Sequence, residues 1–241
     1  MPIGPQDAPE SMLRAELTRR FTTETETVVV SGVPFELLRP RNADDLISEA
    51  DYVADERLPY WADLWPSARA LAAYLLDDHP CVGRMIELGC GLGLVTAAAL
   101  RAGCDVLATD YYMDALQFAR LNALHATGRE PAIRHLDWSA LPAVADLGTF
   151  DLVVAADVLY EHRYSALVAK AIAHTLAPGG RALIADPGRI GAPAFFEQCQ
   201  ALGLQVAATD RRAVDSTTAR HEVTIYTLSY AVVASRGQGA R

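Results

Sequence analysis

The chain has 241 residues, of which 51% are hydrophobic and 21% are charged, a composition typical of a folded globular protein and not of a disordered or fibrous one. Its 21 Lys and Arg residues and its 30 Asp and Glu residues give a formal net charge of −9, which opposes binding to nucleic acid or to an anionic membrane. The sequence shows neither a signal-peptide pattern nor an uninterrupted apolar stretch long enough to cross a membrane, so we expect a cytoplasmic protein.

The first part of the chain predicts a β-hairpin. Two stretches rich in strand-forming residues, 25–31 and 34–39, flank a Gly-Val pair that suits a turn. The pattern changes near Pro59, so we expect an N-terminal extension over residues 1–58 and a second domain over residues 59–241.

The second domain begins with a helix and then alternates between strands and helices. Apolar residues recur at helical spacing behind Pro66, which suits a helix start. Short apolar stretches predict five strands, at residues 84–88, 105–109, 132–136, 150–156 and 181–185. Helical patterns stand between and after them, at residues 94–102, 114–126, 165–176 and 193–202.

This alternation predicts an α/β fold in which a doubly wound sheet carries helices on both faces. Two further strand candidates, residues 205–209 and 223–232, have no clear crossover helix between them. We therefore expect them to pair antiparallel at one edge, which gives a seven-strand sheet that is mostly parallel.

The four cysteines carry no metal-site pattern. Cys81, Cys90, Cys104 and Cys199 form no C-x-x-C pair, and no histidine is placed to complete a zinc site. We expect four buried free thiols and no bound metal.

A glycine-rich turn, ELGCGLG, follows the first strand of the alternating region and precedes a helix. Gly89, Gly91 and Gly93 let the backbone turn tightly and approach a ligand at the helix N-terminus. A Walker loop is excluded because no Gly-Lys-Ser/Thr follows. A dinucleotide fingerprint would place its third glycine where Leu94 stands, which disfavours a nicotinamide or flavin cofactor.

An acidic residue stands at the end of the second strand. Asp110 follows the glycine turn by about 20 residues, a spacing at which a carboxylate can accept hydrogen bonds from both hydroxyls of a ribose. The position favours a ligand that contains adenosine. A role for Asp110 as the cap of the following helix stays open.

These motifs together resemble the class I, seven-strand, S-adenosylmethionine-dependent methyltransferases. The resemblance is carried by ELGCGLG, by the strand ending in Asp110, by LDW at residues 136–138 and by ADVLYE at residues 156–161. The stretches PYWADLWPSARALAAYL and DVLYEH further resemble the family 16 protein-lysine methyltransferases, which include the group acting on the electron-transfer flavoprotein β subunit. The resemblance covers roughly residues 59–230. It implies a Rossmann-like fold, S-adenosylmethionine as cofactor with S-adenosylhomocysteine (SAH) as product, and a protein substrate.

Carried over position by position, the resemblance implies which residues hold the cofactor. Gly89, Gly91 and Gly93 would lie against its methionine portion, with Glu87 nearby. Asp110 would hold the ribose.

The resemblance implies that other residues contact the adenine and close the mouth of the pocket. Asp137 would accept a hydrogen bond from the adenine amino group, and Trp138 would stack on its ring. Trp65 would close the pocket from the N-terminal side. Trp61 is a further candidate, and a role for it in the core stays open.

The acceptor side is assigned to Asp157 and Tyr160, which follow the fourth strand where an open sheet reverses its order. Methyl transfer to an amine is an in-line displacement in which position, a neutral nucleophile and a suitable field carry most of the catalysis. The resemblance implies that Asp157 orients the amine and balances its positive charge, while Tyr160 shapes the access channel. Purely structural roles stay open for both, and Glu161 and His162 are further candidates.

The sequence thus predicts an S-adenosylmethionine-dependent N-methyltransferase that acts on a lysine of a protein. A small metabolite amine as acceptor is an alternative, because one fold hosts many acceptors. A non-catalytic module that only binds the cofactor is another.

Overall fold

The structure is a computed structural model, and it describes residues 7–46, 58–77, 83–215 and 219–231. The helices are α1 (Asp7–Arg20), α3 (Pro66–Leu76), α4 (Leu94–Arg101), α5 (Met113–Thr127), α6 (Val144–Leu147), α7 (His162–Thr175) and α8 (Ala192–Ala201), with 3-10 turns η1 (Ala43–Leu46) and η2 (Tyr60–Ala62). The strands are β1 (Thr23–Val30), β2 (Val33–Pro40), β3 (Arg84–Leu88), β4 (Asp105–Asp110), β5 (Ala132–His135), β6 (Phe150–Ala156), β7 (Leu176–Asp186), β8 (Leu204–Asp215) and β9 (Arg220–Tyr230).

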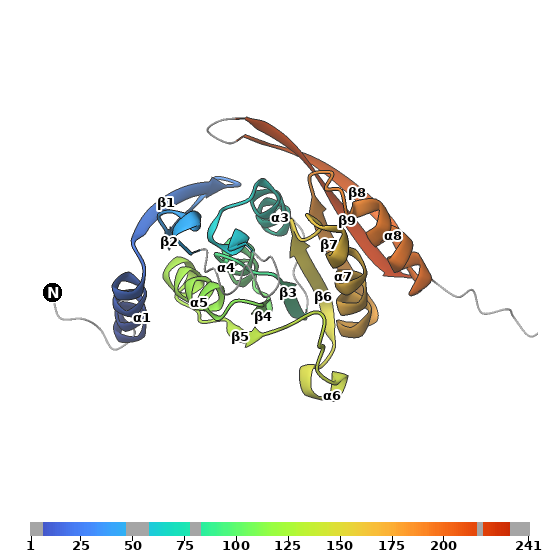
Figure 1. Ribbon diagram of the computed structural model, residues 1–241, viewed down its shortest axis with the longest axis horizontal. Helices are drawn as coiled ribbons and strands as arrows, with labels where there is room; N and C mark the ends of the chain where they lie inside the picture. The colour runs from blue at the N-terminus through green and yellow to red at the C-terminus, as the bar shows by residue number, and fades with distance from the viewer. Residues whose placement is uncertain (1–6, 47–57, 78–82, 216–218, 232–241) are drawn as a thin grey trace, which may run out of the picture.

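The central sheet has seven strands in the order β5-β4-β3-β6-β7-β9-β8 (Figure 1). The five strands from β5 to β7 are parallel, while β9 is antiparallel to both β7 and β8. This arrangement confirms the predicted α/β fold with an antiparallel edge hairpin. The order reverses between β3 and β6, which places a crevice at the carboxyl ends of these two strands.

Helices cover both faces of the sheet because its inner strands are apolar on both sides. Along β3, Met85 belongs to the hydrophobic cluster under α3 and α4, while its neighbour Ile86 belongs to the cluster under α7 and α8. The same alternation holds in β6 for Val154 and Val153. Two cores therefore hold the sheet rigid beneath the crevice.

The N-terminal segment forms the predicted hairpin, with β1 and β2 paired antiparallel from Thr23↔Pro40 to Val30↔Val33. The buried side chain of Asn122 on α5 fastens this hairpin: its amide donates to the carbonyl oxygens of Leu38 and Leu92, each at 2.9 Å. The hairpin is thereby joined to the glycine turn. The predicted division after residue 58 stays a prediction, since residues 47–57 lie outside the described ones.

Helix α1 was not expected from the sequence. Of its side chains that the structure describes, from Glu10 onward, Leu13 and Leu17 are the buried ones, and they join Phe118 and Leu121 of α5 in one cluster. Two apolar contacts one helical turn apart are too few to give a recognisable period.

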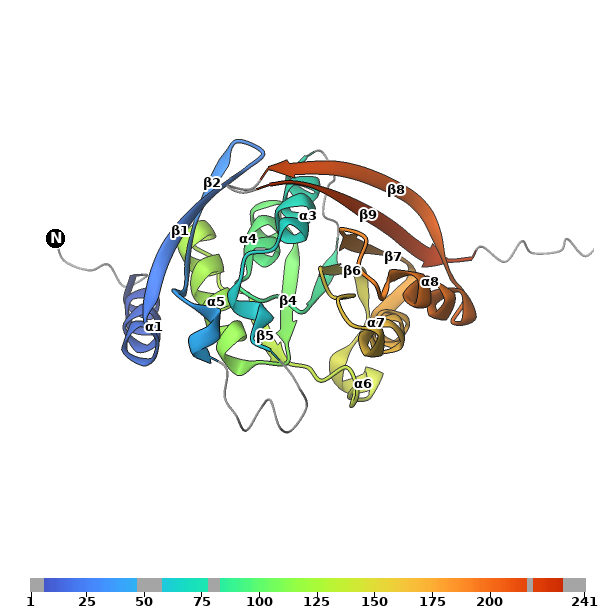
Figure 2. The ribbon, with the colours of Figure 1, turned by 45° about the horizontal axis from the view of Figure 1, so that its top comes forward.

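The strands at the antiparallel edge are longer than predicted. β7 begins at Leu176 and runs through the Pro-Gly-Gly segment with a register shift against β6, where the sequence predicted only a helix stop. β8 continues to Asp215 although most of its side chains are exposed, because pairing with β9 extends it beyond its apolar residues. In both views the β8-β9 hairpin arches toward α3 and the N-terminal hairpin (Figures 1 and 2), and its contacts with α3 confirm this packing.

The cysteines differ in part from the prediction. Cys90 and Cys199 are buried and free. Cys104 is buried but disulfide-bonded, so the predicted free thiol is wrong there. Disulfide formation depends on the distance between Cβ atoms in space, which spacing along the chain does not reveal. Cys81 lies outside the described residues.

Candidate active site

One cavity lies at the carboxyl ends of β3, β4 and β6, where the sheet order reverses. It encloses about 1080 Å³, the open space at its mouth included. Every residue that the sequence proposed for the site lines it: Trp65, Glu87, Gly89, Gly91, Gly93, Asp110, Asp137, Trp138, Asp157 and Tyr160. Of the further candidates, Trp61 and Glu161 also line the cavity, whereas the exposed His162 is not among its lining residues.

The glycine turn needs residues without side chains. Gly89, Gly91 and Gly93 have φ angles of 75°, 49° and 80°, in the left-handed region that L-residues rarely adopt. A Cβ on Gly93 would stand 2.5 Å from Cα of Ala119 on α5, and one on Gly91 would stand 3.1 Å from the carbonyl oxygen of Trp61. Gly93 therefore lets α4 and α5 pack closely while its neighbours bring bare backbone to the cavity.

Asp110 fastens the glycine turn to the end of β4. Its Oδ2 accepts a hydrogen bond from the backbone N–H of Gly91 and its Oδ1 one from Tyr112, each at 3.0 Å. Burial raises the pKa of Asp110, and these N–H donors oppose the rise. Each carboxylate oxygen has a second lone pair, so the group can also accept ligand hydroxyls.

Glu87 lies in β3 beneath the turn and is 2% exposed. The Oγ1 of Thr96 on α4 donates a hydrogen bond to its Oε2. Burial raises the pKa of Glu87 to about 8, and the neighbouring Asp110 adds to the rise. The floor of the cavity therefore contains a carboxyl group that is neutral over most of the physiological range.

Asp137 and Trp138 stand on the loop after β5. Oδ1 of Asp137 accepts hydrogen bonds from the backbone N–H and the hydroxyl of Ser139, at 2.8 and 2.6 Å, which fixes the turn. The Trp138 indole lies edge-on to Tyr164, with ring centroids 5.9 Å apart. Among the described residues its buried Nε1–H finds no acceptor.

Asp157 is held differently from what the sequence led us to expect. It is 5% exposed and has a φ of 60°, an uncommon conformation for a residue other than glycine. Its Oδ1 accepts from Nε of Arg189 at 2.6 Å, and its Oδ2 accepts from Oγ of Ser67 at 2.9 Å. Sequence reasoning missed both partners: Arg189 stands in no motif, and the motif that contains Ser67 does not reveal a contact with a residue 90 positions away.

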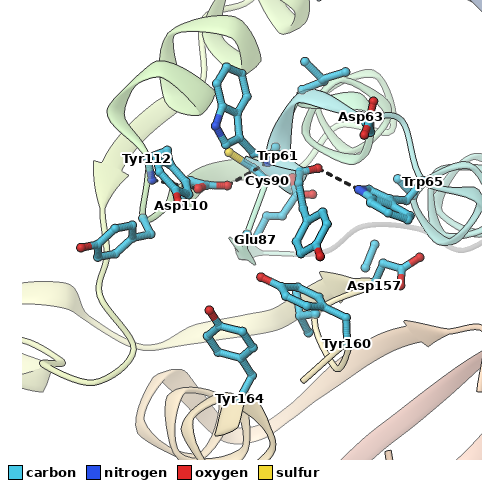
Figure 3. A pocket seen from close by; sticks show the side chains of 18 of the residues that line it. Trp61, Asp63, Trp65, Glu87, Cys90, Asp110, Tyr112, Asp157, Tyr160 and Tyr164 are labelled. Carbon is cyan, nitrogen blue, oxygen red and sulfur yellow. Dashed lines mark hydrogen bonds between the residues drawn. The ribbon is translucent and has the colours of Figure 1, made fainter. Parts of the chain in front are cut away.

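Aromatic side chains form a wall on the same side of the cavity. The centroid of Tyr160 lies 5.1 Å from those of Tyr60 and Tyr164, and Tyr60 lies 5.9 Å from Trp65. Figure 3 shows Tyr160 and Tyr164 pointing into the cavity opposite Asp110 and Cys90. Burial raises the pKa of Tyr160 far above its usual value, so its phenol is neutral. Sequence reasoning assigned no role to Tyr60 or Tyr164.

The residues present fit S-adenosylmethionine. The turn offers bare backbone beside Asp110, and the unpartnered Trp138 Nε1–H lies in the wall near Gly89, whose added Cβ would stand 3.5 Å from the indole. The Asp110 carboxylate, the turn without side chains and the Trp138 indole suit the ribose, the amino acid portion and the adenine, respectively. Among the described residues, no group of three or more His, Cys, Asp and Glu side chains is placed to hold a metal ion.

Known proteins are similar to this chain in sequence and in fold. A family model described as lysine methyltransferase matches residues 59–200. The electron transfer flavoprotein beta subunit lysine methyltransferase of Xenopus laevis is 35% identical over 136 residues, which cover 54% of this chain and 53% of that protein. A ubiquinone biosynthesis O-methyltransferase of Xylella fastidiosa is 32% identical over 122 residues, which cover 48% and 47%.

The chain thus spans about half the length of the curated relatives it matches. Among solved structures, magnesium protoporphyrin IX methyltransferase from Synechocystis PCC 6803 with bound SAH is similar with a TM-score of 0.52 at 18% identity, covering 68% of this chain and 82% of that one. That likeness shows the fold. Since the family model covers more than half of the chain, the protein belongs to the lysine methyltransferase family, whose cofactor is S-adenosylmethionine as the sequence predicted.

Proposed function

We propose that the protein methylates the ε-amine of a lysine in a protein substrate, and that it does so in the cytoplasm. One observation carries the proposal: a single cavity joins the glycine turn and Asp110 to a wall of aromatic rings around Tyr160. Membership of the lysine methyltransferase family supports it, as does the lysine acceptor named for the Xenopus relative. Among the helices that the structure describes, none is long and apolar enough to cross a membrane.

The donor side of the cavity is built from backbone and carboxylates. S-adenosylmethionine, when bound, supplies a methyl group whose bond to sulfur breaks as the amine nitrogen bonds to it, leaving SAH and releasing a proton. Asp110 would accept the ribose hydroxyls, and Asp137 the adenine amino group. Gly89 and Gly91 would let the ligand approach the backbone closely.

The acceptor side is built to admit an alkyl amine. Tyr60, Trp65 and Tyr160 offer ring faces along which an unbranched side chain can lie, and aromatic faces attract the charge that forms on a methylated amine. The neutral phenol of Tyr160 can accept a hydrogen bond from the amine without adding a charge. Asp157 supplies a carboxylate in the same wall, which favours the developing positive charge.

The test is transfer of label from labelled S-adenosylmethionine into a lysate of the protein's own source. We expect label in a protein band, methyl-lysine after hydrolysis, and no labelling once the lysines of the lysate are acetylated. The Asp110→Ala variant, which weakens the donor side, is the matched control and should label slowly.

A small-molecule acceptor is the second candidate, favoured by the similarity to an O-methyltransferase of ubiquinone biosynthesis. It predicts label in the low-molecular-weight fraction that acetylation of protein lysines leaves unchanged. Label in neither fraction, with SAH still bound, would reject both and identify a binding module.

A further inference from the structure

A polar cluster surrounds Asp157 at the acceptor wall, and its other members take no part in the mechanism above. It consists of Ser67 on α3, Asp157 after β6, and Asp186 and Arg189 at and after the end of β7. We call it the acceptor brace. Arg189 is the cation among these four residues: Asp157 binds its guanidinium, and Asp186 binds its backbone N–H.

Arg189 is fixed at its main chain as well as at its side chain. Its backbone N–H donates to Oδ2 of Asp186 at 3.0 Å, and that oxygen also accepts from Gly188 at 2.7 Å. Asp186 is 1% exposed, so its carboxylate is a buried anchor for the loop. The Arg189 side chain itself is 33% exposed, which lets it span from the surface to the nearly buried Asp157.

The guanidinium of Arg189 contacts two parts of the wall at once. Its Nε lies 2.6 Å from Oδ1 of Asp157, and its Cζ lies 5.2 Å from the centre of the Trp65 ring. This indole is also oriented by the bond from its Nε1 to the carbonyl oxygen of Tyr60 at 2.8 Å and by the edge-on Tyr60 ring. In Figure 3 the Asp157 carboxylate lies below Trp65 and points away from the rings of Tyr160 and Tyr164.

The direction of that carboxylate matters because the nucleophile in methyl transfer is the neutral amine. A carboxylate free to reach into the cavity would pair with the acceptor as an ammonium ion and stabilise its protonated form. A carboxylate already bound by a guanidinium still contributes a field but does not form that pair.

We propose that Arg189 is a positioning residue of the methyl-transfer site. It holds the Asp157 carboxylate under Trp65, so that the acceptor amine is not trapped as an ammonium ion, and it braces the indole as one wall of the channel. This inference rests on the proposed function for its kinetic test but has a second test that does not.

The kinetic test compares Arg189→Ala with Arg212→Ala. Arg212 is a matched control: it binds Asp77 at 2.7 Å and covers the Tyr74 ring at 5.1 Å, but it lies on β8 and not among the cavity residues. For Arg189→Ala we expect kcat to fall roughly 10- to 100-fold, with the KM of the protein acceptor unchanged or lower and the SAH affinity within about twofold of the parent. Arg189→Lys, which keeps the charge but not the planar group, should recover part of the loss.

Parental kcat in Arg189→Ala, a raised KM with unchanged kcat, or an equal loss in Arg212→Ala would overturn the inference. If the parent protein methylates no lysine, the proposed function is wrong. Crystal structures of the two variants then still test whether Arg189 positions the Asp157 carboxylate. We expect the Asp157 carboxylate to turn into the cavity in Arg189→Ala and to keep its place in Arg212→Ala. An unchanged Asp157 side chain in both would refute the positioning role.

Discussion

The two sides of the cavity are held in place by different kinds of interaction. On the donor side, the glycine turn, Glu87 and Asp110 lie within 24 consecutive positions and bind one another through backbone groups and the Thr96 hydroxyl. On the acceptor side, Asp157 depends on Ser67 and Arg189, which come from other elements. The donor side is therefore a local motif, whereas the acceptor side is formed by tertiary packing. Substitutions on the two sides should therefore affect different properties, such as cofactor affinity and turnover.

The largest effect should come from the closest packing on the donor side. In Gly93→Ala the new Cβ would meet Ala119 of α5 and the backbone would keep a left-handed φ. We expect a loss of about 3–5 kcal/mol in the free energy of unfolding, by overpacking and strain together. Gly103→Ala is the control, because its φ is 93° and nothing lies within 4 Å, so it should lose only about 1–2 kcal/mol. Equal losses in urea unfolding would contradict the packing role.

Glu87 should make the stability of the donor side depend on pH. Its pKa is raised from 4.5 to about 8, so the folded state holds the proton more tightly than the unfolded state does. The stabilisation from this proton is complete below pH 4.5 and is lost as the pH rises through 8. At about 1.4 kcal/mol per pH unit over the three units from pH 5 to pH 8, Glu87→Gln should therefore gain about 4 kcal/mol relative to the parent between pH 5 and pH 8.5.

The measurement is urea unfolding of both proteins at the two pH values. Glu130→Gln, which makes the same change at an exposed carboxylate that pairs with Arg120, provides the comparison. A difference between Glu87→Gln and the parent that stays constant with pH would show that the buried carboxyl is not protonated in the folded state.

The Asp110 carboxylate should matter for cofactor affinity. Asp110→Ala removes an acceptor of ribose hydrogen bonds and releases the N–H groups of Gly91 and Tyr112. We expect SAH affinity, measured by calorimetry, to fall by roughly 2 to 4 kcal/mol. Asp110→Asn keeps one oxygen acceptor and should fall between the two proteins. An unchanged dissociation constant in Asp110→Ala would refute the ribose assignment.

The smallest effect is expected for one hydroxyl on the acceptor side. Tyr160→Phe keeps the ring that contacts Tyr60 and Tyr164 and removes one neutral hydrogen-bonding group. The activation free energy should rise by about 1 kcal/mol, so turnover should fall roughly fivefold, and SAH affinity should stay unchanged. Tyr226→Phe on β9 should leave initial rates as they are. A loss of several hundredfold in Tyr160→Phe would give the phenol a direct chemical role that its neutral state does not support.

Sequence reasoning reached the fold and the donor side for the same reason. Alternating strands and helices, a glycine turn and Asp110 at a strand end are all local patterns, and each reports the structure around itself. The acceptor brace has no such pattern, because Arg189 meets Asp157 only after β6 and β7 have paired. Helix α1 and the disulfide of Cys104 escaped prediction likewise, since each depends on what the chain packs against.

The division of the cavity is tested most directly by measuring SAH affinity and initial methylation rate side by side in Asp157→Ala and Asp110→Ala. We expect Asp157→Ala to keep the parental affinity and to lose about a hundredfold in turnover, because it removes a preorganised charge from the acceptor side. Asp110→Ala should lose affinity first and recover much of its rate at saturating cofactor. Parental turnover in Asp157→Ala, or a loss that follows its SAH affinity, would contradict a cavity with separate donor and acceptor sides.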